Sequence, residues 1–168
     1  ANINATNNVS VSGNLVQGGT TGMLNITQND TRFAMRNLTV GGDFIALNNY
    51  ADFISEYDIN ITGDITVNSP ARALLSADGN LSAGDVTNAG YLSLSGMDAD
   101  LGAIVNTGEL DLYVNGEANI DSLTITNGKV FVNGSGIINS TGAINAVGKI
   151  VSDENDGIGG DLIMHAAD

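Results

Sequence analysis

The sequence has no cysteine and no tryptophan, and it contains one proline and one histidine among 168 residues. Without cysteine, thiol catalysis, disulfide bonds and thiolate metal sites are all excluded. The single histidine, His165, has no second histidine or cysteine with which to build a zinc site or a catalytic triad. The commonest signatures of an enzyme are therefore missing.

Basic residues are also scarce, because five Lys and Arg stand against nineteen Asp and Glu for a formal net charge of −14. Such a charge repels nucleic acid and anionic lipid surfaces. No stretch approaches the ~18 consecutive apolar residues of a membrane span. The sequence thus predicts no nucleic-acid partner and no membrane insertion.

The residues that are abundant indicate an all-β protein. Glycine occurs 22 times and hydrophobic residues make up 42% of the chain. Gly, Asn, Ser and Thr recur every few residues, which disfavours long helices. The density of Ile, Val and Leu disfavours disorder. This composition is typical of extracellular β proteins.

Two short phrases repeat along the chain. One phrase consists of alternating aliphatic residues, then Gly-Asp, then another hydrophobic residue, and its aspartates are Asp43, Asp64 and Asp85, at intervals of 21 residues. An Asn-x-Gly-x-aliphatic phrase starts at Asn88 and again at Asn106, an interval of 18 residues. Short alternating segments that read as strands lie between these turns.

An antiparallel sandwich and a parallel β-helix both contain short strands separated by glycine and asparagine turns. The parallel β-helix is favoured because similar residues recur at the same phase of the repeat, which stacking in register rewards. Asparagine at the turns tolerates left-handed backbone and can ladder its amide with the asparagine above. We expect an all-β, single-stranded parallel β-helix (β-solenoid) of about eight windings, each of roughly 18–21 residues.

This β-helix is expected to form a single domain over residues 1–168, with no obvious capping helix. Two stretches, residues 17–37 and 46–58, depart from the repeat and hold four of the eight Phe and Tyr residues. Either they form less regular, loop-bearing segments at one corner, where binding often resides, or their aromatic side chains widen the core of the first windings.

The Gly-Asp/Asn-aliphatic phrases and Asn-x-Gly-x-Leu/Ile turns of residues 38–164 resemble the repeats of filamentous-haemagglutinin-like adhesins. These are large secreted β-helical proteins of bacteria and include autotransporter passengers. The resemblance lies in the style of the repeat, and it implies a rod-shaped, non-catalytic surface protein used in adhesion, aggregation or display. The chain differs from this family in being short and very acidic and in lacking the expected start of a secretion domain.

Asp43, Asp64 and Asp85 are the candidates for chemistry, because one phase of the repeat would stack them about 5 Å apart. That separation suits a retaining carboxylate pair or a calcium site. The alternative is that Asp after Gly serves the turn alone. None of the basic residues repeats in phase with the aspartates as a cationic partner: Arg32, Arg36, Arg72, Lys129 and Lys149. We expect no enzyme activity and no cofactor, with calcium as the one candidate ligand.

These observations lead to three hypotheses of function. The first is an extracellular or cell-surface, secreted solenoid that mediates attachment to a host or cell-surface receptor or glycan, or self-association. The second is a filament subunit whose open ends stack head to tail, because heterologous contacts of this kind give open polymers. The third is a polysaccharide-binding or polysaccharide-active β-helix of the tailspike type.

Overall fold

The computed structural model of the chain describes residues 2–4, 9–17, 24–27, 37–126, 128–134, 137–146, 149–152 and 163–166. All regular elements in these ranges are strands, and none of them is a helix. Every strand pairing is parallel, which confirms the β-helix and rules out the antiparallel sandwich for this part of the chain.

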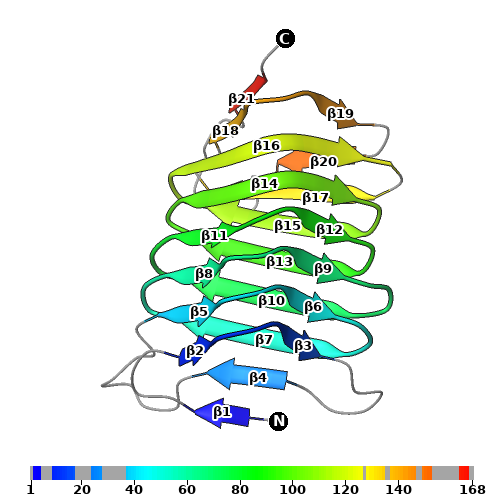
Figure 1. Cartoon of the computed structure of the whole chain (residues 1–168). Coiled ribbons are helices and arrows are strands. Elements are labelled where there is room, and N and C mark those ends of the chain that lie inside the picture. Colours follow the sequence, from blue (N-terminus) through cyan, green and yellow to red (C-terminus); the bar gives the residue numbers. More distant parts are fainter. Residues whose placement is uncertain are drawn as a thin grey trace.

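The strands form two sheets (Figure 1). The first sheet has eight strands, in the order β1 (Asn2–Asn4), β4 (Leu24–Thr27), β7 (Tyr50–Ser55), β10 (Arg72–Ala77), β13 (Tyr91–Gly96), β15 (Glu109–Val114), β17 (Lys129–Gly134) and β20 (Lys149–Ser152). The second sheet has thirteen: β2 (Val9–Val11), β3 (Leu15–Gln17), β5 (Leu38–Val40), β6 (Phe44–Ala46), β8 (Ile59–Ile61), β9 (Ile65–Val67), β11 (Leu81–Ala83), β12 (Val86–Asn88), β14 (Ala99–Asn106), β16 (Glu117–Ile125), β18 (Ile137–Ser140), β19 (Ile144–Ala146) and β21 (Ile163–Ala166).

Each winding crosses the first sheet once, and it crosses the second sheet either as two short strands, as β5 and β6 do before β7, or as one long strand, as β14 does (Figure 1). Hydrogen bonds between equivalent positions of successive windings span 18 to 22 residues above Asn37, close to the expected period, and 29 residues between Asn14 and Asp43. The described residues hold about five complete turns. Further strands continue the stack on both sides, so that the first sheet counts eight strands.

The strands are longer than the sequence suggests in the upper windings, where β14 and β16 run without a break across the second sheet. In the lower windings three residues, such as 62–64, separate the two short strands. Only two residues occupy the same place in β14, Gly102 and Ala103, and the strand continues through them. The connection of the winding below, Gly84 and Asp85, is also two residues long, yet β11 and β12 remain separate strands, so its length alone does not decide whether the strands merge.

The aromatic-rich stretch at residues 46–58 is a regular part of the solenoid. It contains β7, which pairs in register with β10, and the ring of Phe53 is buried in the core. Residues 50–55 of this stretch are therefore a strand of the first sheet, and Phe53 contributes its ring to the core. Of residues 17–37, the segments 18–23 and 28–36 lie outside the described residues, while β4 lies between them and pairs with β7.

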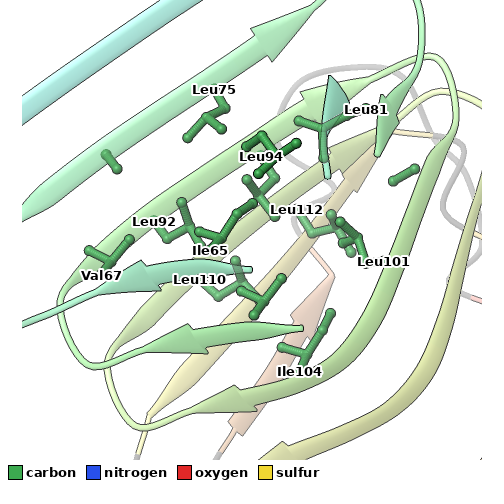
Figure 2. Packing of buried hydrophobic residues seen from close by; sticks show 14 of the residues in the cluster. Ile65, Val67, Leu75, Leu81, Leu92, Leu94, Leu101, Ile104, Leu110 and Leu112 are labelled. Atoms are coloured by element: carbon green, nitrogen blue, oxygen red, sulfur yellow. The ribbon is translucent and has the colours of Figure 1, made fainter. Parts of the chain in front are cut away.

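The core is a set of columns in which the inward residue of each strand lies on the equivalent residue of the winding below. Figure 2 shows leucines of the first sheet meeting Ile65, Leu101 and Ile104 of the second sheet between the two layers. The columns include Phe44–Ile65–Val86–Ile104–Leu123 and Phe53–Leu75–Leu94–Leu112–Val132, all of them buried. Most of this burial exists only when a neighbouring winding is present, because each winding alone exposes both of its edges.

Residue size is balanced across the core. The rings of Phe44 and Phe53 meet edge to face with centroids 5.2 Å apart, a favourable aromatic geometry. The small side chains of Ala46 and Ala51 are buried in the same winding. Two large rings therefore occupy the interior of this winding beside two of the smallest side chains.

Adjacent residues of β14 provide a test of the core. The side chain of Ile104 is 1% exposed and that of Val105 is 42% exposed, so the two point to opposite faces of the strand. Ile104→Ala should lower the free energy of unfolding by about 2–5 kcal/mol, since it removes buried methyl groups and leaves a cavity. Val105→Ala, the matched control, should cost less than about 1 kcal/mol. Urea denaturation followed by circular dichroism measures both, and equal losses would contradict this core.

Candidate functional site

The three aspartates of the repeat lie in one column, as the sequence predicts. They occupy the corner between the two short strands of each winding, which we call the Gly-Asp corner. The backbone N–H of Asp64 donates to Oδ1 of Asp43 (3.1 Å), and the N–H of Asp85 donates to Oδ1 of Asp64 (2.9 Å). Asn14 continues the ladder below and Ala103 above, through bonds of 3.0 and 2.9 Å.

The glycine before each aspartate has a steric reason. A Cβ atom on Gly63 would overlap Oδ1 of Asp43, and the same relation holds between Gly102 and Asp85. Each aspartate side chain therefore lies across the glycine of the next winding on its way to the following backbone N–H. The corner is further tied by backbone bonds from glycine to glycine, such as Gly84 to Gly63 at 2.8 Å.

This geometry gives the aspartate column a structural role. The Oδ1 atom of each aspartate already accepts a charge-assisted hydrogen bond from the winding above, a strong class of hydrogen bond. Oδ2 of Asp43 also accepts from Nδ2 of Asn14 at 3.3 Å. Among the described residues, no group of three His, Cys, Asp or Glu side chains is arranged to hold a metal ion. Calcium binding by Asp43, Asp64 and Asp85 stays a prediction.

Gly84 tests the ladder because its Cβ would lie 2.5 Å from Oδ1 of Asp64 and at least 3.0 Å from the backbone below. Gly84→Ala should lower the free energy of unfolding by about 1–3 kcal/mol through this overlap. The loss should shrink when the same change is made in an Asp64→Ala background, because the overlapping atom is then gone.

Gly13 is the matched control for this test. It stands in the same phrase, before Asn14, but no atom lies within 4 Å of a Cβ built on it. Gly13→Ala should therefore change stability by less than about 0.5 kcal/mol. Thermal or urea unfolding of Gly84→Ala, Asp64→Ala, the double variant and Gly13→Ala measures these changes. If Gly84→Ala lowers the free energy of unfolding equally with and without Asp64, the ladder is contradicted.

A second ladder, at the corner after the first-sheet strand, was not anticipated from the sequence. The N–H of Asp58 donates to Oδ1 of Asn37 (3.0 Å), and the N–H of Asn80 donates to Oδ1 of Asp58 (2.9 Å). Higher up, the N–H of Glu117 donates to Oδ1 of Asp98 (2.9 Å). The available signal was a glycine one position before two of the donors, since a Cβ on Gly79 would crowd Asp58 and a Cβ on Gly116 would crowd Asp98.

The Asn-x-Gly phrases form a third ladder, and this one is buried. Asn88 and Asn106 are 1% and 0% exposed, and Nδ2 of Asn88 donates to Oδ1 of Asn106 at 2.7 Å. Nδ2 of Asn106 also donates to the carbonyl of Lys129 in the next winding (2.9 Å), so the ladder reaches across three windings. The amide ladder is confirmed. The left-handed backbone that asparagine tolerates is not used, because no described non-glycine residue has a positive φ.

The outward face of the first sheet differs from the rest of the surface, and we call it the aromatic wall. Its residues stand in three columns, set by the strand register: Tyr50, Arg72, Tyr91, Glu109 and Lys129; Asp52, Leu74, Ser93, Asp111 and Phe131; and Ile54, Ser76, Ser95 and Tyr113. The two outward columns of the second sheet contain small polar and β-branched residues with one aspartate: Thr39, Asn60, Ser82, Asp100 and Asn119; and Ile45, Thr66, Thr87, Val105 and Thr124.

Arg72 is the centre of the aromatic wall. Its guanidinium carbon lies 4.5 Å from the centroid of the Tyr91 ring, a cation–π arrangement. Burial raises the pKa of the Tyr91 hydroxyl, the charge of Asp111 raises it further, and Arg72 opposes both. The pKa of Tyr50 is also raised by burial and by Asp52, again against the effect of Arg72. Cation, rings and carboxylates are thus close enough to act on one another.

A shallow hollow of about 420 Å³ lies at one margin of the aromatic wall. Arg72, Tyr91 and Glu109 provide its charged and aromatic groups, while Ala71, Ala89 and Gly90 keep it open. Two other hollows, of about 400 and 250 Å³, lie over the second sheet. Each of these is lined by three aspartates and by no basic or aromatic residue.

Asp52 on the aromatic wall allows a test by pH. Partial burial raises the pKa of its carboxyl group in the folded protein, so the ionised form destabilises the fold relative to the unfolded chain. Asp52→Asn should therefore raise the free energy of unfolding at about pH 7, and the gain should fade as the pH falls through the raised pKa and wild-type Asp52 becomes protonated. Asp78→Asn, which removes the same charge from an exposed turn, controls for net charge. A gain from Asp52→Asn that persists at about pH 3 would contradict this assignment.

The remaining candidates from the sequence are placed as follows. Arg72 and Lys129 stand in one column of the aromatic wall, and Lys149 pairs with Lys129 in register. Arg32 and Arg36 lie outside the described residues. His165 lies on β21, paired with Asn139 of β18.

Comparison of the chain with protein-family models, with curated proteins and with solved structures finds no match. Within the described part of the chain, no helix is long and apolar enough to cross a membrane.

Proposed function

We propose that the chain is a non-catalytic, extracellular β-solenoid that attaches to surfaces or associates with itself. The observation that supports the proposal is that the repeated polar residues are engaged in hydrogen bonds between windings. The aspartates and asparagines that recur along the sequence bind the next winding, so their repetition is explained by stacking alone. What distinguishes one face from another is the composition of the outward columns.

Three features support attachment through the walls. The stacked windings form long, regular faces (Figure 1). The hollows described above are shallow and lie on these faces. Aromatic residues and arginine, which are enriched in protein contact surfaces, gather on one of them. The proposal includes the resemblance to filamentous-haemagglutinin-like adhesins, which rests on the style of the repeat and on the β-solenoid fold, and with it a secreted, cell-surface location.

The hypotheses of a filament subunit and of a polysaccharide-active protein have less support from the structure. The head-to-tail filament stays a prediction, because no contact among the described residues tests it. A polysaccharide-active site is less well supported, since the stacked carboxylates that suggested it accept backbone hydrogen bonds. Polysaccharide binding without hydrolysis is compatible with the aromatic wall.

Retention of coated beads on cell surfaces tests the proposal. Fluorescent beads that carry the folded chain should be retained on bacterial or epithelial cells, or should agglutinate, several-fold more than beads that carry the urea-unfolded chain. Folded windings are required because only stacking creates the walls. Beads that neither adhere nor agglutinate, with a chain that stays monomeric in sedimentation velocity, would overturn the proposal. Release of reducing ends from a polysaccharide panel would overturn its non-catalytic part.

A further inference from the structure

The outward aromatic and basic side chains gather on one side of the solenoid. Among residues whose side chains the structure describes, every outward aromatic ring belongs to the first sheet or to the turn that follows it: Tyr50, Tyr57, Tyr91, Tyr113 and Phe131. Both described basic side chains, Arg72 and Lys129, also lie there. In a chain with a net charge of −14 and five basic residues, this concentration defines a distinct surface.

The guanidinium of Arg72 is held in place by its neighbours. It lies over the ring of Tyr91, and the strand register sets Arg72 between Tyr50 and Tyr91. A planar guanidinium fixed in this way offers paired N–H donors with little loss of side-chain freedom on binding. Arg72 is nonetheless exposed, as is Glu109 across the hollow.

The hollow combines space with polar groups, as a site for a small ligand requires. Ala71, Ala89 and Gly90 leave room beside the larger side chains. Arg72 offers hydrogen-bond donors to this hollow, and the carboxylate of Glu109, which also lines it, offers acceptors. A few polar groups at the margin of an aromatic surface are typical of sites that fix the orientation of a ligand.

We propose that the aromatic wall binds a neutral glycan, with Arg72, Tyr91 and Glu109 around the hollow as the contacting residues. Neighbouring hydroxyl groups of a sugar can accept hydrogen bonds from two N–H groups of a guanidinium and can donate hydrogen bonds to a carboxylate. The apolar C–H face of the ring suits the aromatic side chains of the wall. This inference rests on the proposed attachment function and names its ligand.

The local charge selects a neutral ligand. Glu109 stands in the same column as Arg72 and Lys129, and Asp52 and Asp111 stand in the neighbouring column, so the wall has no excess of positive charge. An acidic polysaccharide would meet both these carboxylates and the overall charge of −14. A second copy of the chain docked on this wall would meet the same repulsion. Hydroxyl groups avoid this cost because they carry no charge.

Titration with soluble oligosaccharides tests the inference directly. The probes are neutral pentasaccharides of glucose, galactose, mannose and N-acetylglucosamine, with pentagalacturonate as the acidic comparison. Saturation-transfer NMR and calorimetry should detect at least one neutral probe, with a Kd that changes little with salt. Arg72→Ala and Tyr91→Ala should each raise this Kd about tenfold, and Arg72→Lys should weaken binding although it keeps the charge.

The control is Thr87→Ala, an exposed residue on the opposite sheet, which should leave the Kd unchanged. Circular dichroism and the unfolding midpoint verify that every variant is folded. The inference is overturned if no neutral probe binds, if the wall variants bind as the wild type does, or if pentagalacturonate binds more tightly in a salt-dependent manner.

Failure of this inference and failure of the proposed function give different results. Beads that adhere to cells stripped of glycans by glycosidases indicate a protein partner, which ends the glycan inference and leaves attachment intact. Soluble probes that bind while coated beads fail to adhere or agglutinate support the glycan site and end the attachment function.

Discussion

The fold depends on one constraint, that equivalent residues of successive windings lie directly upon one another. Parallel strands are spaced by about 4.8 Å, so each position of a winding meets the same position of the next. A side chain is acceptable only if it packs against, or hydrogen-bonds to, what stands above and below it. Aliphatic residues satisfy this in the core columns, and asparagine and aspartate satisfy it at the corners.

The corners show how the constraint selects residue types. An aspartate at the Gly-Asp corner bonds the backbone of the next winding only if the residue before its partner has no Cβ, which is why Gly63 precedes Asp64 above Asp43. At the Asn-x-Gly corner the side chain points inward, and a carboxylate buried there would need a compensating charge. The neutral amide of Asn106 can donate and accept at once, so it satisfies groups in the windings on both sides.

The requirement that equivalent residues stack also explains which columns could be predicted from the sequence. The column of Asp43, Asp64 and Asp85 was predictable because their winding lengths are nearly equal and the Gly-Asp phrase marks the phase. The aromatic wall was missed because its residue types differ from winding to winding, so no repeated letter reveals the column. Its signal was the residue after the glycine of each asparagine turn: Tyr91 and Glu109 in the two Asn-x-Gly phrases, and Lys129 in the shorter phrase Asn127-Gly128.

The residue types of the buried columns and of the exposed columns are therefore constrained to different degrees. Interior and corner positions are fixed by the winding next to them, and a change such as a Cβ at Gly102 disturbs Asp85 one level below. Outward positions on the first sheet meet only solvent and their column neighbours, which leaves them free to vary. In a protein whose repeated residues are occupied by stacking, residues that break the repeat are the ones free to serve binding. Arg72 over Tyr91 is such a departure, since a cation and a ring replace the small polar residues found on the outward columns of the second sheet.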